Sequence, residues 1–262
     1  MLRPSCQQQA PMRILVTFAV EAEFAPWRRR HNFQKVNGGS VEAYSAQISG
    51  ADVCVLFTGI GCRKAWVQAT RVIWPGNVDV CISSGFAGSL RPEYQPGDVL
   101  VAREVWGQTA GATIQCDELL VQLATKCGAT PVGVFLTKDQ VVVEAVQKRC
   151  LGADADAVEM ESACILSEAA SLGARSVAIR AISDSVSENL PIDFNRTTSK
   201  SGDVDKVRLI TEIVRSRTKA FGMFRLFEHT RAARENLADF LSQYIERLTQ
   251  VSGEPQLKVA AQ

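Results

Sequence analysis

Histidine is scarce in this 262-residue chain, which contains only His31 and His229. Cysteine is more frequent, with eight residues, but no two of them form a Cys-x-x-Cys pair. Because zinc sites need cysteine and histidine ligands at short spacings, the sequence predicts no metal site, and no cofactor is expected. Cys54 and Cys81 fall in apolar runs, where cysteine packs as a small hydrophobic residue. We therefore expect the cysteines to be reduced thiols in a cytoplasmic protein.

Long apolar runs and an excess of charge are also missing. No run of eighteen apolar residues occurs, so no segment is expected to span a membrane. The 29 basic and 28 acidic residues leave a net charge of +1, which argues against a dedicated nucleic-acid binder. The hydrophobic share of 46% is enough for a sizeable core in one large α/β domain or two small ones.

Short β-branched runs alternate along the chain with segments of helical length. Nearly continuous apolar strands are typical of a parallel or mixed sheet whose two faces are both covered by helices. The predicted fold class is therefore α/β, with ligands beyond the carboxyl ends of the strands. Strands are expected at 13–18, 53–57, 78–83, 98–102, 132–136 and 176–182, and helices at 64–74, 117–127 and 162–172.

The chain is expected to fall into four segments. Residues 1–11 form a disordered leader, 12–202 the catalytic domain, 203–251 a helical extension packed on the same domain, and 252–262 a tail. The extension is predicted to contain two helices, at 203–227 and 230–251, because apolar residues recur on one helical face. Between Lys206 and Arg234 basic residues outnumber acidic ones by eight to two.

Carboxylates stand at the ends of several expected strands. They occur in Glu21-Ala22-Glu23, in Val158-Glu159-Met160-Glu161-Ser162 and in Arg180-Ala181-Ile182-Ser183-Asp184. Carboxylates gathered at one edge of a sheet suit acid/base chemistry on a sugar or a base. Each has another explanation when taken alone, because acidic residues also favour the first turn of a helix and the N-cap position.

Two glycine motifs follow strands of the same sheet. Gly59-Ile60-Gly61 lacks the full spacing of a dinucleotide-binding loop. Gly85-Phe86-Ala87-Gly88 is compatible with an ordinary tight turn. It is equally compatible with a backbone that approaches a ligand closely.

Together these motifs resemble the purine nucleoside phosphorylase superfamily, and most closely its 5′-methylthioadenosine/S-adenosylhomocysteine nucleosidase branch. The resemblance covers about residues 12–195 and includes Pro96-Gly97-Asp98. Leu190-Pro191-Ile192-Asp193-Phe194-Asn195 also resembles the hopanoid-associated nucleosidase/phosphorylase branch. The resemblance implies a three-layer α/β/α sandwich with a mixed central sheet, here followed by the helical extension. It also implies cleavage of the N-glycosidic bond between ribose and a purine.

The resemblance also implies roles for individual residues. Asp184 matches the acid that protonates the departing base, and Ser183 would orient it. That acid must hold a proton, which burial in an apolar strand favours. Glu161 matches the carboxylate that grips the ribose hydroxyls and stabilises a cationic sugar, and Arg180 would balance the acids. The substrate-binding set implied by the resemblance is Phe86, Ala87, Gly88, Val141, Val142, Val158, Glu159, Met160, Ser183 and Phe194.

The sequence departs from the family pattern at three positions. Val141 stands where relatives place an aromatic ring against adenine, so aliphatic packing would replace stacking. Phe86 stands at the position of a small hydroxyl residue, and Ser83 at that of an arginine that grips phosphate in some phosphorylases.

Water is the expected nucleophile because Glu23 matches the carboxylate that activates water in nucleosidases. Two unit charges 4 Å apart interact by about 4 kcal/mol at an effective dielectric constant near 20. A carboxylate would therefore repel a phosphate ion at this place, unless a cation such as Arg63 intervened.

The predicted activity is hydrolysis of a 5′-substituted adenosine, similar to methylthioadenosine, S-adenosylhomocysteine or adenosylhopane. Two alternatives stay open: a phosphate-dependent phosphorylase and a non-catalytic nucleoside-binding domain. The expected partners are a small-molecule nucleoside and further copies of the chain in a homodimer or higher oligomer. The basic helices of the extension could also contact an anionic membrane peripherally, although covering the core or a dimer interface would explain them as well.

Overall fold

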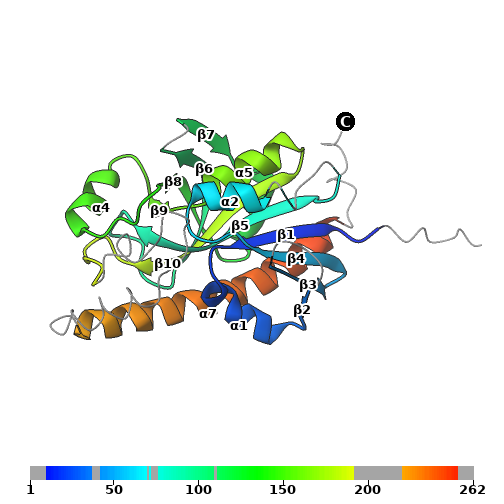
Figure 1. Ribbon diagram of the computed structural model, residues 1–262, viewed down its shortest axis with the longest axis horizontal. Coiled ribbons are helices and arrows are strands. Elements are labelled where there is room, and N and C mark those ends of the chain that lie inside the picture. Colours follow the sequence, from blue (N-terminus) through cyan, green and yellow to red (C-terminus); the bar gives the residue numbers. More distant parts are fainter. Residues whose placement is uncertain are drawn as a thin grey trace, which may run out of the picture.

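A single mixed β-sheet organises the computed structural model of the chain, as Figure 1 shows. The structure describes residues 10–36, 42–69, 71, 76–108, 111–191 and 220–252. The strands are β1 (Arg13–Phe18), β2 (Gln34–Lys35), β3 (Ala43–Ile48), β4 (Ala51–Phe57), β5 (Val80–Ser89), β6 (Val99–Gly107), β7 (Ala112–Gln115), β8 (Thr130–Thr137), β9 (Ala157–Glu159) and β10 (Arg175–Asp184). The helices are α1 (Glu21–Arg30), α2 (Cys62–Ala69), α3 (Glu118–Lys126), α4 (Ala145–Leu151), α5 (Ser162–Ser171) and α7 (Ala220–Ser252).

Five of the strands close into a ring. The sheet follows the order β10-β6-β8-β9-β5-β1-β4-β3-β2, and β10 also pairs with β5. β5 runs parallel to β1 and β10, whereas β9 pairs antiparallel with β5 and parallel with β8. The ring matters for the site because it brings the ends of β5, β9 and β10, which are distant in sequence, beside one another.

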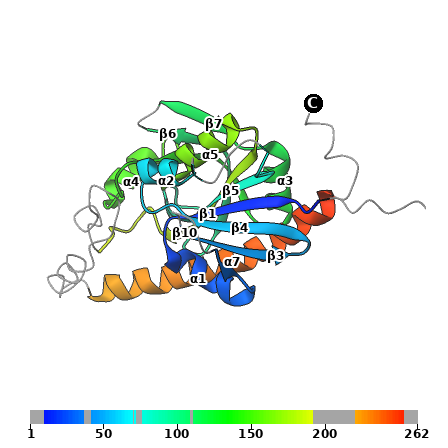
Figure 2. The same ribbon diagram turned by 45° about the vertical axis from the view of Figure 1, so that its right-hand side comes forward.

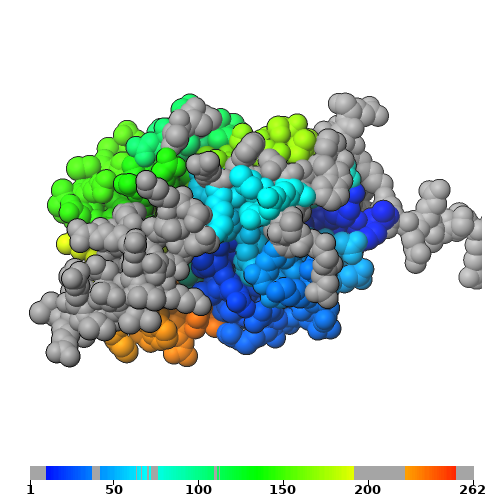
Figure 3. All heavy atoms as spheres, viewed as in Figure 1, coloured from blue at the N-terminus to red at the C-terminus, as the bar shows by residue number. Residues whose placement is uncertain are grey.

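Helices cover both faces of this sheet, as Figures 1 and 2 show. Helices α1 and α7 lie together on one face, where the Trp27 ring nitrogen donates to Ser242 Oγ at 3.1 Å. Helices α2 and α5 lie on the other face, and α2 reaches the surface in the space-filling view (cyan, Figure 3). The prediction of a three-layer fold with a mixed sheet is confirmed.

Helix α7 extends along the sheet without a break. Its apolar face is buried in the main core through Leu237, Leu241, Tyr244 and Leu248, and the Tyr244 hydroxyl donates to the Leu120 carbonyl at 3.0 Å. The expected boundary between two helices near 228–229 is wrong, because a single helix runs from Ala220 to Ser252. Residues 203–219 of the predicted extension lie outside the described ranges. None of the described helices combines the length and apolar character that crossing a bilayer requires.

The segment Gly85–Gly88 is not a turn. It lies inside β5, which continues to Ser89, because Gly88 is paired on both sides, with Val158 of β9 and Asp184 of β10. Sequence patterns also missed β2, β3, β7, β9 and α4. Most of these strands are short, and short strands carry little periodicity.

The cysteine prediction is corrected at one pair. Cys62, at the start of α2, and Cys164, in α5, form a disulfide with their Cα atoms 5.5 Å apart. Their sequence separation of 102 conceals this proximity, which arises from the packing of α2 on α5. Cys54, Cys81, Cys116, Cys127 and Cys150 are free thiols.

Replacing both Cys62 and Cys164 by serine should lower the free energy of unfolding by about 2–4 kcal/mol under non-reducing conditions, because the disulfide restricts a long loop of the unfolded chain. Denaturant titration measures the change. Cys150→Ser, which alters an exposed free thiol, is the control and should leave stability unchanged. Equal stability of the oxidised and reduced wild type would contradict the prediction.

Candidate active site

A cavity of about 270 Å³ opens where β5, β9 and β10 meet. Most of the predicted site residues line it, namely Glu23, Phe86, Ala87, Gly88, Val141, Val142, Val158, Glu159, Met160, Glu161, Ser183 and Asp184. Arg180 is buried behind this wall, and Phe194 lies outside the described residues. Sequence reasoning missed the lining residues Ala19, Val20, Ile60, Gln140, Leu190, Leu226 and Thr230.

Strand register explains how these residues meet. Gly88 of β5 is the Cα partner of Val158 in β9 and of Asp184 in β10. The pairing of β10 with β5 shifts between Ile182 and Asp184, which re-aims the end of β10. A Cβ at Gly88 would stand 3.0 Å from Asp184 Oδ2, so the absence of a side chain there lets the carboxyl lie against the strand.

Arg180 is the electrostatic centre beneath the cavity. Its guanidinium donates to the Ser84 carbonyl at 2.6 Å and to Ser162 Oγ at 2.8 Å, and it also bonds Ser83 Oγ and Glu159 Oε2. A buried cation needs such partners, since its desolvation is otherwise uncompensated. Ser83 thus serves as an acceptor for an arginine of the same chain.

The Glu159 carboxylate accepts several hydrogen bonds from other groups of the protein. Besides Arg180, its carboxylate accepts the backbone N–H groups of Glu161 (3.0 Å) and Ser162 (2.8 Å) and the hydroxyl of Thr137. These contacts fix the start of α5, where unpaired N–H groups favour a carboxylate. The geometry therefore favours a positioning role for Glu159 over direct contact with substrate.

Glu161 points back to the loop before α2. Its Oε1 accepts the Gly61 N–H at 2.9 Å, and its Oε2 lies 3.7 Å from Arg180 Nη2. Burial raises the pKa of Glu161 to about 8, against the lowering effect of Arg180. Arg180 is shared with Glu159, so it compensates the second carboxylate only in part.

Glu23 folds back over the start of α1. Its two oxygens accept the backbone N–H groups of Ala19 (2.9 Å), Val20 (3.1 Å) and Phe86 (2.9 Å). Burial raises the pKa of Glu23, while Arg180 and these N–H groups oppose the rise. A raised pKa brings a carboxylate closer to the range in which it works as a general base near neutral pH.

Asp184 has a partner that the sequence did not suggest. Its Oδ1 accepts the Ser183 hydroxyl at 2.7 Å, and its Oδ2 accepts a hydrogen bond from the ammonium of Lys148, in α4. Lys148 is fully buried. The expectation of an apolar setting for Asp184 is therefore wrong. In the sequence, Lys148 stands beside Arg149 in a segment that resembles a solvated helix face, so no local pattern reveals it.

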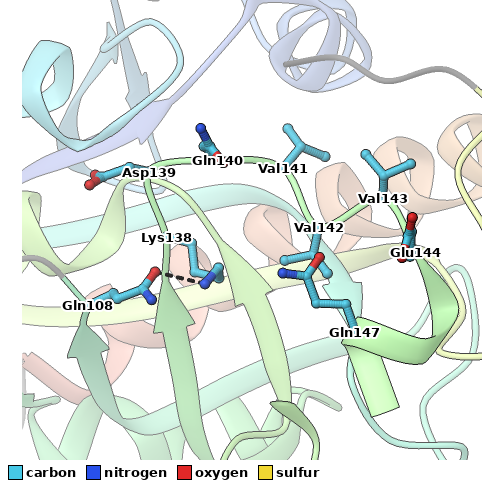
Figure 4. Close-up of a pocket in the computed structure, with 9 residues that line it drawn as sticks. All are labelled: Gln108, Lys138, Asp139, Gln140, Val141, Val142, Val143, Glu144 and Gln147. Carbon is cyan, nitrogen blue, oxygen red and sulfur yellow. Dashed lines mark hydrogen bonds between the residues drawn. The ribbon is translucent and has the colours of Figure 1, made fainter. Parts of the chain in front are cut away.

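A second cavity of about 510 Å³ adjoins the first. Figure 4 shows the loop 138–144 along it, with Val141 and Val142 on opposite sides of the backbone and Lys138 bonded to Gln108 at 2.7 Å. Both cavities share Gln140, Val141 and Val142. Within the described ranges, no group of three or more histidine, cysteine or acidic residues is arranged to hold a metal ion.

The chain belongs to the phosphorylase superfamily, whose family model matches residues 13–221. Three solved structures illustrate the similarity of fold. The first is 5′-methylthioadenosine/S-adenosylhomocysteine nucleosidase from Helicobacter pylori with butyl-thio-DADMe-Immucillin-A (21% identity, 91% of this chain and 99% of that one, TM-score 0.70). The same enzyme from Neisseria meningitidis with methylthio-immucillin-A is 23% identical, with 89% and 98% covered and a TM-score of 0.67. Futalosine hydrolase of Helicobacter pylori is 20% identical, with 90% and 97% covered and a TM-score of 0.68.

Glu161→Gln should change how stability depends on pH. The folded pKa of Glu161, about 8, is above its value of 4.5 in the unfolded chain. Its favourable contribution is therefore complete below pH 4.5 and is lost as the pH rises through about 8.

Glu161→Gln has no carboxyl group at this position, so it does not lose stability through the ionisation of residue 161. Its free energy of unfolding relative to wild type should therefore rise between pH 5 and pH 9, by on the order of a few kcal/mol. Denaturant titrations at the two pH values measure the difference. Glu246→Gln, on the exposed side of α7, should follow the wild type, and a pH-independent offset for Glu161→Gln would contradict the prediction.

Gly85→Ala should damage the site directly. Gly85 has φ of +140°, and a Cβ there would stand 2.6 Å from Arg180 Nη1 and 2.7 Å from Glu23 Oε1. Displacing these groups should lower kcat/KM for base release at least ~100-fold. Gly173→Ala is the matched control, because Gly173 also has a positive φ (+79°) but no atom within 4 Å of the added Cβ. It should lose about 1–2 kcal/mol of stability and keep its activity; equal activity losses would refute the argument.

Proposed function

We propose that the protein is a nucleosidase that hydrolyses the N-glycosidic bond of a 5′-substituted adenosine and releases the purine base. The observation that carries the proposal is the convergence of Asp184, Glu161 and Glu23 on one cavity. These three carboxyl groups match the three tasks of the reaction, which are protonating the base, stabilising the sugar cation and activating the nucleophile.

In the proposed reaction, the bond between the base and C1′ of ribose breaks as a ring nitrogen of the base gains a proton through Asp184. Glu161 binds the ribose hydroxyls, and its ionised form, which its raised pKa makes the larger fraction only above about pH 8, stabilises the positive charge on the sugar. Glu23 accepts a proton from the attacking water. Met160, Val158 and the backbone of Phe86 to Gly88 would shape the site around sugar and base.

Water is the proposed nucleophile because of the charge of the cavity wall. Glu23, Glu159, Glu161 and Asp184 line it, and in the described part of the chain no lysine or arginine does. The guanidinium of Arg180 is already bonded to Ser84, Ser162 and Glu159. A phosphate dianion would face several carboxylates at this place, which disfavours phosphorolysis.

The 5′ substituent is proposed to be apolar. Ile60, Leu190 and Leu226 line the cavity beside Thr230. Leu226 and Thr230 come from α7. Methylthio- or homocysteine-type groups suit such a wall, and a larger adenosylhopane-like group is a second candidate because Phe224 and Phe227 of α7 are exposed nearby in sequence. The futalosine hydrolase comparison adds a third candidate.

The decisive assay incubates the protein with adenosine, 5′-methylthioadenosine, S-adenosylhomocysteine, an adenosylhopane and futalosine, with and without phosphate. Release of free base at the same rate in both conditions is expected. Formation of a ribose-1-phosphate would support the phosphorylase alternative, and binding without turnover would support a nucleoside-binding domain.

Asp184→Asn should lower base release by about 100-fold or more, because general acids contribute on that scale. Removing the carboxylate also leaves Lys148 without its ionic partner, so stability should fall by up to about 3–5 kcal/mol. Activity is therefore measured per folded molecule, with circular dichroism as the folding measure. Near-wild-type turnover would exclude Asp184 as the acid.

Cytoplasmic location, self-association and peripheral membrane contact through the C-terminal helices stay predictions. The disulfide weakens the cysteine argument for the cytoplasm, since disulfides persist mainly in oxidising compartments. Size-exclusion chromatography with light scattering tests the homodimer. Co-sedimentation with anionic vesicles tests membrane contact, and no binding would count against it.

A further inference from the structure

Lys148 is the buried cation nearest to the proposed acid, and its contacts all converge on the segment that carries that acid. Its ammonium donates to Asp184 Oδ2 and, at 3.0 Å each, to the carbonyls of Ser185 and Glu188. An ammonium has three N–H groups, so these three acceptors satisfy it completely. Helix α4 thereby holds the end of β10 and the turn after it in one position.

Both oxygens of Asp184 receive hydrogen bonds within the protein. Oδ2 accepts from Lys148 and Oδ1 accepts from the hydroxyl of Ser183. A carboxyl group that accepts at both oxygens beside an ammonium is in its ionised form. An ionised Asp184 has no proton to give, so the proton for the base must first reach it from a neighbour.

We propose that Lys148 is the positioning residue that supplies this proton through Asp184, an inference that rests on the proposed function. The two groups that donate to Asp184 are an alcohol and an ammonium, and of these the ammonium is the acid. Its side chain is fully buried and its hydrogen bond to Asp184 Oδ2 is direct, so a proton can pass between the two groups without an intervening water.

The step balances as follows. The bond from C1′ to the base breaks, and its electron pair goes to the base. Lys148 Nζ gives a proton to the Asp184 carboxylate, the carboxyl gives a proton to a ring nitrogen, and the base leaves neutral. The water oxygen bonds to C1′, and its proton goes to Glu23. Solvent then takes the proton from Glu23 and returns one to Lys148.

The test compares two leaving groups. One substrate is the nucleoside that the wild type cleaves, and the other is the 4-nitrophenyl riboside with the same 5′ substituent. Nitrophenolate departs without protonation, so its release does not need an acid. Its rate therefore also reports whether the site of each variant is folded.

Lys148→Met should lower kcat on the nucleoside at least ~100-fold, with KM within about threefold, and should leave the nitrophenyl riboside within about threefold of wild type. Asp184→Asn should show the same split. Lys126→Met, at the exposed end of α3, is the matched control and should change neither rate. Equal losses on both substrates would make Lys148 merely structural and overturn the proposal, as would unchanged nucleoside turnover.

Lys148→Arg separates proton supply from charge. A guanidinium keeps the positive charge but does not release its proton in proteins. The variant should therefore stay impaired on the nucleoside and active on the nitrophenyl riboside. Recovery of nucleoside turnover would show that charge alone suffices and would overturn the proposed transfer.

Failure of this inference differs from failure of the proposed function. A wild type that releases no base from any nucleoside would refute the function. A wild type that is active and depends on Asp184, but not on Lys148, would refute the proton supply alone.

Discussion

The buried guanidinium of Arg180 is the interaction on which the site depends. It joins β10 to the Ser84 carbonyl of β5 and to Glu159 at the end of β9. Through Glu159 it also fixes the first N–H groups of α5. A buried cation with this many partners permits little rearrangement, because each lost bond would leave an uncompensated polar group.

The single positive charge of Arg180 explains the pKa shifts of the carboxyl groups around it. Glu159 takes the direct ion pair, so Glu161 and Glu23 share what remains of a single positive charge. Burial then raises the pKa of both. Asp184 is separated from this group by having its own cation, Lys148. The site thus holds two electrostatic units, one around Arg180 and one around Lys148.

The topology of the sheet makes both units possible. The ring of β10, β6, β8, β9 and β5 aligns Asp184, Gly88 and Val158 in adjacent strands. Gly85 and Gly88 allow side chains of other elements to approach β5 more closely than a Cβ would permit. Helix α7 adds Leu226 and Thr230 to the same cavity from the far end of the chain.

The sequence by itself determined the fold class and most of the cavity wall. Alternating apolar runs and helical segments specify an α/β sheet, and carboxylates at strand ends gather at one edge of such a sheet. Only the tertiary structure decided three contacts that no local sequence pattern predicts. They are Cys62 with Cys164, Lys148 with Asp184, and Gly88 with strands on both sides. These contacts depend on how distant elements pack, and side-chain periodicity reports only which face of an element is buried, not which residue it meets there.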